Sequence, residues 1–336
     1  RCPSWGGSAV NPESSPTICA SDIVPVQVEW LWERWLPKGK FVVLDGNPGC
    51  GKTTIAIDIV ARLSAGLPLP TGNAVEPTAS LVLNAEDGAD DTIVPRLIAA
   101  GANTDLVHVW DFDAFFPSLA HGSGWLRDAI HDLGLGLVVL DPLMAFLGGQ
   151  IDSHRDQDKR RGLQPLPQAS KVTGTTILAL RHLRKSPGSA QSMGMGSVGI
   201  GGVARSVFIA APHPHSAGLM VLAPVKNNLS VHPESSLYQI EEKGGQPRIS
   251  WLGSCDLVAD DLVAERAELP SQMDRAIAFL EESLADGPLY CKDVQAGAAD
   301  ANISEATLRR AKKRLGVSSE HIDGRKCWVL HAQHAH

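Results

Sequence analysis

The sequence predicts an α/β domain built on a mostly parallel sheet, followed by a small second domain of helices and a two-stranded turn. From about residue 38 to residue 212, short apolar runs rich in β-branched residues alternate with stretches of helical period. Strands that are covered on both faces have this nearly continuous apolar composition. After about residue 271 the pattern changes to three short amphipathic segments and a turn. This change favours a layered α/β domain with a separate small module.

Six apolar runs are predicted to form the parallel strands: 41–45, 80–85, 106–111, 135–141, 175–182 and 206–211. Helices are expected between them over 53–64, 89–101, 123–133 and 155–172. One face of the first helix carries Ile55, Ile59, Val60 and Leu63. The last helix contains Pro165 and Pro167, so it is either broken or replaced by a loop over 162–168. An antiparallel extension of the same sheet is predicted over 221–227, 236–242 and 247–253.

The carboxyl-terminal segment predicts a winged helix-turn-helix. Its three helices are expected over 272–286, 290–299 and 304–315, and a hairpin over 319–331 turns at Asp323-Gly324. The leading residues are rich in Ser, Pro and Gly and are expected to form a flexible, trimmed leader. The expected order is a leader (1–22), the α/β domain (23–255), a linker (256–270), the winged helix-turn-helix (271–331) and a tail (332–336).

Composition excludes several classes of protein. Of the 336 residues 43% are hydrophobic, and no apolar run approaches the roughly 18 residues that span a bilayer, so no membrane partner is expected. The six cysteines form no CxxC pair and fit neither a zinc ribbon nor a disulfide scaffold, which favours a reducing cytoplasm. A net charge of −7 argues against a protein that coats nucleic acid, because phosphate binding needs Lys and Arg. Any nucleic-acid contact is therefore expected to be local.

The segment GNPGCGKTT at 46–54 lies directly between a predicted strand and an amphipathic helix. A GxxxxGK[ST] motif in this context binds nucleotide phosphates. Its glycines let backbone N–H groups turn inward, Lys52 bridges the β- and γ-phosphates, and the Thr53 hydroxyl binds Mg²⁺. The sequence therefore predicts ATP and Mg²⁺ as cofactors. The residues expected to hold the nucleotide are Gly46, Asn47, Pro48, Gly49, Cys50, Gly51, Lys52, Thr53 and Thr54.

A second Mg²⁺ contact is expected from Asp141, which ends the apolar run LGLVVLD as a Walker B carboxylate does. The next residue is Pro142, which cannot act as a base, so the base must come from elsewhere. The run SLVLNAED ends in Glu86 and Asp87, at the carboxyl edge of a strand expected next to the P-loop strand. Either carboxylate is a candidate, and Glu86 is favoured. This arrangement is typical of RecA-like ATPases.

With these residues in place, the chain resembles the RepA-like hexameric ATPases, a RecA-fold group that includes plasmid replicative helicases and ATPases of phages and mobile elements. The resemblance covers about 28–245 and lies in the order and spacing of GNPGCGKTT, AED at 85–87, VVLDPL at 138–143, LRHLRK at 180–185, GSVGIGGVARSV at 196–207 and APVKNN at 223–228. The chain departs from the family at Met193 and Met195, in a Gly-rich stretch that tends to hold an arginine. The resemblance implies a RecA-like P-loop NTPase core that assembles into a hexameric ring.

The resemblance also implies roles for four residues outside the P-loop. Glu86 is the water-activating base, His182 is a sensor, Arg205 is an arginine finger and Lys226 is a second cation that reaches a neighbour's nucleotide. An arginine supplied by a neighbouring subunit is worth about 10³- to 10⁵-fold in rate. The alternatives are a surface salt bridge for Arg205 and a backbone-bonded histidine at the edge of the core for His182.

The position of Arg205 gives a separate reason to expect a shared site. Residues 205–211 are predicted to form a strand beside 175–182, after a long Gly-rich loop. An arginine at the start of such a strand lies away from the P-loop of its own chain. It is therefore better placed to meet the γ-phosphate of a neighbour.

Basic residues concentrate on the last predicted helix, where Ser304 is expected as the N-cap. The helix and the following turn are expected to contact duplex DNA through Arg309, Arg310, Lys312, Lys313, Arg314, Arg325 and Lys326. The alternative is a solvated face that only packs against the ATPase domain. A second basic stretch is expected to face single-stranded DNA in the ring channel through Lys159, Arg160 and Arg161, although an ordinary exposed helix start explains it equally well.

These observations predict a ring-forming, Mg²⁺-dependent ATPase that acts on DNA as a replicative helicase or helicase loader of a plasmid, phage or mobile element. The alternative is a nucleotide-gated DNA-binding switch that controls assembly and does not unwind DNA. A small-molecule kinase is disfavoured, because a winged helix and an intersubunit arginine would have no role in it. Strand displacement and DNA-stimulated turnover distinguish the first two.

Overall fold

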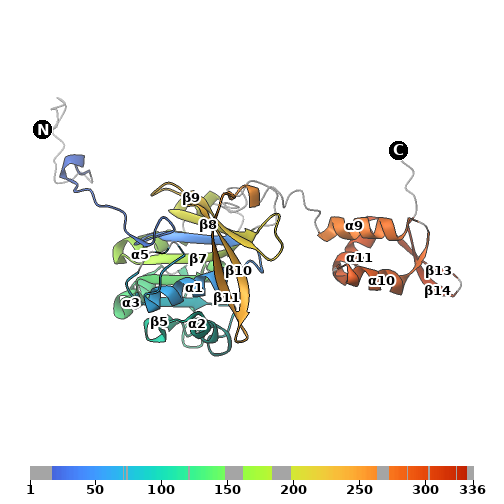
Figure 1. Cartoon of the computed structure of the whole chain (residues 1–336), viewed down its shortest axis with the longest axis horizontal. Helices are drawn as coiled ribbons and strands as arrows, with labels where there is room; N and C mark the ends of the chain where they lie inside the picture. Colours follow the sequence, from blue (N-terminus) through green and yellow to red (C-terminus); the bar gives the residue numbers. More distant parts are fainter. Residues whose placement is uncertain are drawn as a thin grey trace, which may run out of the picture.

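The computed structural model describes residues 17–70, 72, 75–119, 122–147, 162–183, 198–262, 272–285, 287–301, 303–322 and 324–330. Within these residues the strands form a large nine-stranded sheet, a three-stranded sheet near the carboxyl terminus and a two-stranded hairpin near the amino terminus (Figure 1). Among the described residues, no helix has the length and apolar character needed to cross a bilayer.

The nine-stranded sheet has the order β11-β10-β9-β8-β3-β7-β6-β4-β5. Its parallel part consists of β8 (Ser206–Pro212), β3 (Phe41–Gly46), β7 (Thr176–His182), β6 (Leu137–Asp141), β4 (Ser80–Asn84) and β5 (Val107–Val109). Its antiparallel part consists of β9 (Met220–Asn227), β10 (Ser235–Lys243) and β11 (Gln246–Cys255). The predicted α/β class, with a mostly parallel sheet and an antiparallel extension, is therefore confirmed.

Two predictions about which strands are neighbours in the sheet are wrong. The strand that precedes Glu86, β4, does not lie next to the P-loop strand β3, because β6 and β7 are inserted between them. The strand that follows Arg205, β8, pairs with β3 and β9 and does not pair with β7. Buried parallel strands share one apolar composition, so their sequences carry no signal for which of them become neighbours.

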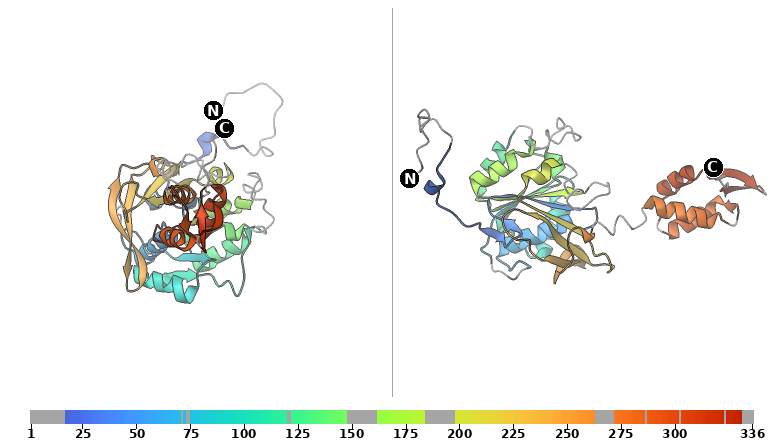
Figure 2. Two further views of the ribbon diagram at one scale, coloured as in Figure 1. Left: turned by 90° about the vertical axis from the view of Figure 1, so that its right-hand side faces the viewer. Right: turned by 90° about the horizontal axis from the view of Figure 1, so that it is seen from above.

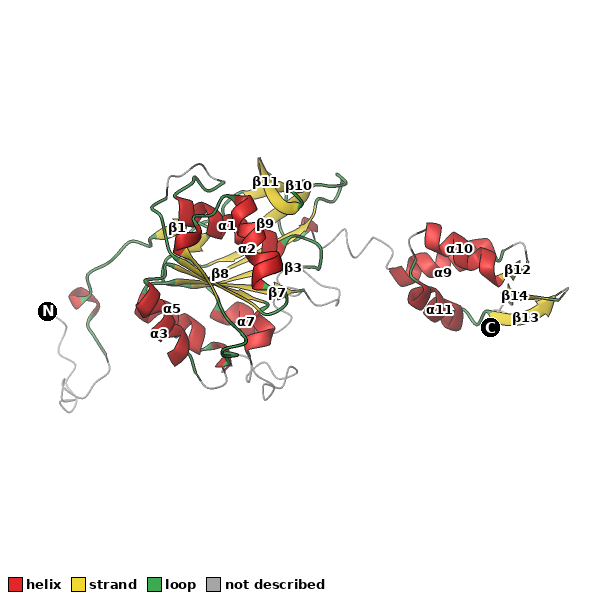
Figure 3. Ribbon diagram, turned by 90° about the horizontal axis from the view of Figure 1, so that it is seen from below, coloured by secondary structure: helices red, strands yellow, loops and turns green. Residues whose placement is uncertain are grey.

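Helices cover both faces of the parallel part (Figure 3). One face packs against α1 (Lys52–Ala65) and α2 (Val94–Ala100), and the other packs against α3 (Gly124–Leu133), α5 (Pro165–Thr173) and the end of α7 (Val198–Val203). Alternate residues of one strand enter the two cores, since Val42 faces α1 and Val43 faces α5. The predicted apolar face of α1 is buried and confirmed: Ile55, Ile59, Val60 and Leu63.

The two prolines of α5 lie in its first turn. The helix begins at Pro165, and Gln164 separates it from helical residues 162 and 163. The first-turn N–H groups of a helix have no intrahelical partner, so a proline there costs little. The predicted interruption therefore falls at Gln164, and 162–168 is not a loop.

A tryptophan-rich hairpin, β1 (Trp30–Trp32) and β2 (Leu36–Pro37), was not predicted. Trp32 and Trp35 are 2% and 1% exposed and stack with ring centroids 4.9 Å apart. Trp35 also contacts Phe208 of β8, at 4.8 Å between ring centroids. Residues 17–29 run out from this hairpin as an exposed segment (blue in Figure 2), so close packing on the α/β domain begins near residue 30.

The carboxyl-terminal module has three helices and its own small sheet. Its elements are α9 (Gln272–Ser283), β12 (Leu289–Tyr290), α10 (Cys291–Asp300), α11 (Glu305–Arg314), β13 (Ser318–Ile322) and β14 (Arg325–Val329). The strand order is β12-β14-β13, and the pairing of β12 with β14 was not predicted. Leu280, Val294, Leu308 and Trp328 meet in a core of their own.

Short helical turns and the start of the expected linker complete the described chain. The turns are η2 (Ala20–Asp22), η3 (Ala89–Ile93), η4 (Thr104–Leu106) and η6 (Leu143–Phe146). The linker was expected over 256–270, but Ala259 and Leu262 are each 7% exposed and pack against β8 and β9. The first part of that range is therefore packed on the α/β domain.

Candidate nucleotide-binding site

The P-loop follows β3 and leads into α1, as the sequence predicts. Gly49 and Gly51 have φ angles of 82° and 72°, which glycine adopts without strain. A Cβ on Gly51 would lie 2.7 Å from Ile240 Cδ1, and one on Gly46 would lie 2.7 Å from the carbonyl oxygen of Ala210. The loop therefore requires glycine for its backbone shape and for its close neighbours. The 14-residue helix α1 begins at Lys52, so its positive dipole end is at this loop.

A cavity of about 410 Å³ opens in front of the P-loop. It is lined by Pro48, Gly49, Gly51, Lys52, Thr53, Thr54, Glu86, Arg96, Asp141, His182 and Ile240. The structure thus brings together Lys52, Thr53, Glu86, Asp141 and His182, which come from four separate segments of the sequence. They meet because the parallel strands β3, β4, β6 and β7 all end at this edge of the sheet.

Lys52 is held between the P-loop and the end of β7. Its Nζ donates to the carbonyl oxygen of Asn47 at 3.0 Å and lies 3.2 Å from Nδ1 of His182. Since the ammonium group donates, Nδ1 accepts and the proton of a neutral His182 is assigned to Nε2. Burial lowers the pKa of Lys52, and the neighbouring acidic groups oppose that shift. A phosphate bound here would supply the negative partner that favours the charged lysine.

Thr53 and Asp141 are in direct contact. Thr53 Oγ1 donates to Asp141 Oδ2 at 2.6 Å, although the two residues are 88 positions apart. Burial raises the pKa of Asp141, and the hydrogen bond from Thr53 opposes this shift. A hydroxyl beside a carboxylate is a donor set that suits Mg²⁺ when phosphates and water complete the coordination. The residues present therefore fit a Mg²⁺–nucleotide complex, with Thr53 and Asp141 as the protein ligands.

The two candidate bases, Glu86 and Asp87, both lie on the turn after β4 but have different partners. Asp87 Oδ2 accepts from a terminal guanidinium nitrogen of Arg96 at 3.2 Å. Glu86 is exposed and lines the cavity. Because Asp87 is engaged by an ion pair, Glu86 is the carboxylate better placed to hold a water molecule at the cavity.

Three residues of this region were missed by sequence reasoning. Arg96 reaches the cavity from α2, and Asn84 donates from Nδ2 to Asp141 Oδ2 at 3.1 Å. Ile240 comes from the β10–β11 hairpin, which also holds the P-loop through Tyr238 Oη, a donor to the carbonyl oxygen of Cys50 at 2.6 Å. An arginine on a short helix and an isoleucine far along the chain carry no motif. Asn84 offered one signal, an amide at the end of a buried apolar strand.

The structure places Arg205 and Lys226 at the opposite edge of the sheet. The backbone N–H of Arg205 donates to the carbonyl oxygen of Phe41, at the start of β3, whereas the P-loop follows the end of β3. Arg205 is exposed. Lys226 Nζ donates to the carbonyl oxygens of Gly201 and Ala204 at 2.6 and 2.8 Å. Burial lowers the pKa of Lys226, and the charge of Arg205 adds to the shift. Neither side chain belongs to the P-loop cavity of its own chain.

The basic residues of α11 divide into two groups. Those that are exposed are Arg309, Arg310, Lys313 and Arg314. Lys312 instead lies 4.4 Å from the ring centroid of Trp328 and donates to Ser319 Oγ, so it stabilises the packing of the helix on the sheet. Arg325 also lies over an aromatic ring, 5.8 Å from that of Tyr290, and Lys326 is exposed. Ser304 accepts from the N–H of Thr307, which confirms the predicted N-cap.

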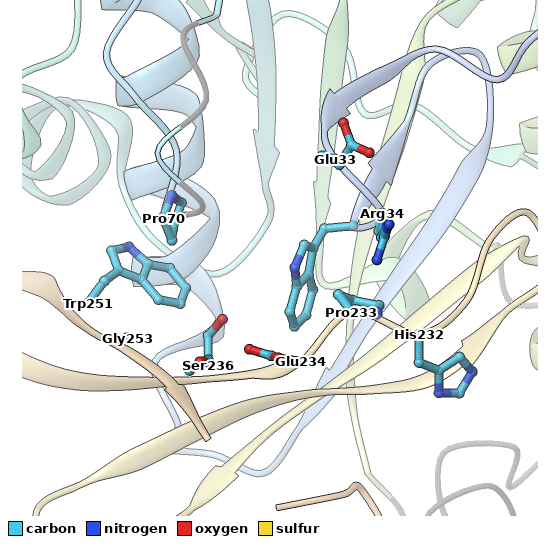
Figure 4. A pocket seen from close by; sticks show the side chains of 11 residues that line it. Glu33, Arg34, Pro70, His232, Pro233, Glu234, Ser236, Trp251 and Gly253 are labelled. Carbon is cyan, nitrogen blue, oxygen red and sulfur yellow. The ribbon is translucent and has the colours of Figure 1, made fainter. Parts of the chain in front are cut away.

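Some predicted residues lie outside the described residues: Lys159, Arg160, Arg161, Met193 and Met195. A second cavity, of about 770 Å³, lies beside the β1–β2 turn (Figure 4). Glu33, Arg34, Glu234 and Trp251 are among its lining residues. It adjoins the first residues of β10 and the last residues of β11, away from Ile240, and holds none of the predicted site residues.

The strand order, the P-loop between β3 and α1, and Asp141 at the end of β6 define a RecA-like P-loop ATPase. Residues 16–188 match the AAA domain family AAA_25, and the chain belongs to this family. The fold is also similar to a KaiC-like protein of the archaeon Pyrococcus horikoshii OT3, at 15% identity and a TM-score of 0.46, over 67% of this chain and 100% of that one. A comparable similarity to a second solved structure, an ATPase domain, has 12% identity and a TM-score of 0.47, over 63% and 85% of the two chains. A search of curated proteins found no match.

Proposed function

We propose that this protein hydrolyses ATP in a Mg²⁺-dependent reaction at the P-loop cavity. The observation that carries the proposal is the meeting of Lys52, Thr53, Asp141, Glu86 and His182 around one cavity. A phosphate-binding loop, a Mg²⁺-binding pair and a carboxylate base are the parts that hydrolysis of a phosphoanhydride needs. The membership in an AAA domain family supports the same reaction.

Each residue has a defined task in this proposal. Lys52 and the P-loop N–H groups hold the β- and γ-phosphates, and Thr53 and Asp141 hold the metal. Bound Mg²⁺ neutralises charge on the phosphate oxygens. Glu86 orients a water molecule for in-line attack and accepts its proton. His182 contacts Lys52, so it senses whether the phosphate site is filled.

We also infer that the active site is completed by a second copy of the chain. Arg205 is exposed at the edge of the sheet opposite its own P-loop, which suits a contact with the nucleotide of a neighbour. The resemblance to RepA-like ATPases favours a hexameric ring with Arg205 as its arginine finger. Lys226 can join this contact only after it leaves the carbonyl oxygens of Gly201 and Ala204.

Replacement of Lys52 by alanine tests the nucleotide site. The Nζ group bonds to Asn47 and His182 at the wall of the cavity and not to the apolar core, so the fold should survive its removal. We expect tight ATP binding to disappear in a calorimetric titration, with an unchanged circular dichroism spectrum. Lys171→Ala, an exposed lysine on α5, is the matched control and should bind ATP as the native chain does. Retained micromolar affinity in Lys52→Ala would contradict the assignment.

The carboxyl-terminal module is proposed to be a winged helix-turn-helix that binds duplex DNA. Its order of three helices, with a sheet formed by β12, β13 and β14, supports this class. The exposed side chains of Arg309, Lys313 and Arg314 on α11 support contact with phosphates. The proposed cellular role is that of a replicative helicase or loader of a plasmid, phage or mobile element. ATPase activity without strand displacement would instead favour a nucleotide-gated switch.

Triple replacement of Arg309, Lys313 and Arg314 by alanine tests the DNA-binding surface. The affinity for duplex DNA should fall, and the slope of log affinity against log salt should flatten by up to about 0.9 for each phosphate that is no longer neutralised. Lys312→Ala is a poor probe, because it also removes the packing on Trp328. Fluorescence anisotropy at several salt concentrations measures both quantities. An unchanged slope would mean that α11 does not bind DNA.

A further inference from the structure

Asn84 stands between the two groups on which the proposed hydrolysis depends, the Asp141 carboxylate and the turn that carries Glu86. It is the last residue of β4 and is 4% exposed. Its Nδ2 donates to Asp141 Oδ2 at 3.1 Å. Its Oδ1 accepts from the backbone N–H of Glu86 at 3.0 Å and from that of Asp87 at 2.7 Å. One amide therefore bonds the metal-side carboxylate and the base-bearing turn at the same time.

The backbone explains why a side chain is needed here. Asn84 and Asp141 are register partners in the parallel pair of β4 and β6. The ladder continues for one more bond, from the N–H of Ala85 to the carbonyl oxygen of Asp141 at 2.8 Å. Beyond Ala85 the chain leaves the sheet, so the next two N–H groups take the Asn84 side chain as their acceptor. The path of the chain at Glu86 is thus set by this side chain.

The same carboxylate oxygen is also tied to the P-loop helix. Thr53 Oγ1 and Asn84 Nδ2 both donate to Asp141 Oδ2, at 2.6 and 3.1 Å. The hydrogen bonds form a continuous chain from the start of α1 through Asp141 and Asn84 to Glu86. An amide of this length supplies both a donor for Asp141 and an acceptor for the turn, whereas an ionised aspartate lacks the donor and leucine lacks both.

We propose that Asn84 is a positioning residue for ATP hydrolysis, which fixes the turn at Glu86 relative to Asp141. The proposal rests on the proposed function of the same cavity. Its effect is exerted through Glu86, because a carboxylate must lie within hydrogen-bond reach of the attacking water to act as a base. Groups that orient the residues of a metal site typically change activity by about 10- to 100-fold when removed.

A double-mutant cycle tests the proposal. In the native chain, Asn84→Ala should lower kcat by about 10- to 100-fold while the KM for ATP changes less than about threefold. In a Glu86→Gln chain, the same change should lower the residual rate by less than about threefold, because the group that Asn84 positions is already absent. An equal loss in both backgrounds would overturn the proposal, since a general weakening of the fold does not depend on Glu86.

Two further variants distinguish the loss of the specific hydrogen bonds of Asn84 from the general effect of weakening a turn. Asn103→Ala removes a comparable acceptor, for the N–H of Asp105 at 3.2 Å, in a turn that contributes no residue to the lining of the P-loop cavity, and should leave the rate unchanged. Asn84→Leu keeps the approximate size of the side chain and loses both the donor to Asp141 and the acceptor for the turn. We expect it to lose kcat as Asn84→Ala does, and a native rate would overturn the proposal. This variant also serves if Asn84→Ala does not fold. Native turnover of Glu86→Gln alone would mark failure of the proposed base, which is a separate result.

Discussion

Replacement of Glu86 by glutamine is expected to lower kcat by about 10²- to 10⁴-fold while ATP still binds. Glutamine keeps the size of the side chain and can still hydrogen-bond, but it cannot accept the proton of the attacking water. The substituted chain should therefore retain ATP together with Mg²⁺ without turning it over. Rapid chemical quench with labelled ATP measures the bound and hydrolysed fractions directly.

Asp87→Asn is the matched control for this prediction. Asp87 adjoins Glu86 on the same turn but is engaged by Arg96, so its replacement should lower kcat much less than Glu86→Gln does. If Glu86→Gln lowers turnover by less than about tenfold and Asp87→Asn lowers it more, then Asp87 is the base. That result would contradict the role assigned to Glu86 and leave the nucleotide site intact.

Replacement of Arg205 by alanine is the second change with a large expected effect. A guanidinium that meets the transferred phosphoryl group from a neighbour is worth about 10³- to 10⁵-fold in rate, so turnover should fall by that order. Affinity for ATP should change less than turnover does, because an arginine finger acts mainly on the charge that develops in the transition state. Arg205→Lys keeps the charge but not the forked geometry and should restore only part of the rate.

Arg127→Ala is the control for the general loss of an exposed arginine. Arg127 lies on α3 and is exposed like Arg205. We expect its rate to stay near that of the native chain. An equal loss in Arg127→Ala and Arg205→Ala would mean that neither arginine has a specific part in hydrolysis.

Much of this site could be predicted from the sequence, because short motifs carry its chemistry. The P-loop needs glycines at fixed spacing, and Asp141 follows an uninterrupted apolar run. The role of His182 comes from resemblance to a family, that of Arg205 comes from the resemblance and from its place before a predicted strand, and both roles stay predictions. The structure does place His182 against Lys52 and Arg205 far from its own P-loop.

The rest of the site could not be predicted from the sequence, because it depends on which segments of the chain become neighbours in space. Buried strands of one composition gave no signal that β6 and β7 separate β4 from β3. Arg96 reaches the cavity from a seven-residue helix whose pattern marks it only as a surface position. Lys312 belongs to a run of basic residues, yet its ammonium group packs over the ring of Trp328. In each case a tertiary contact decides the role of a residue whose local pattern is ambiguous.

We propose that two copies of the chain share each active site, and mixing two inactive variants tests this proposal. Glu86→Gln chains and Arg205→Ala chains should each be inactive alone. In a mixture, some interfaces pair an intact Glu86 with an intact Arg205, so turnover should return to a measurable fraction of the native rate. The steady-state ATPase rate of the mixture, with co-assembly confirmed by light scattering, is the measurement. A mixture that co-assembles and remains inactive would contradict a shared active site.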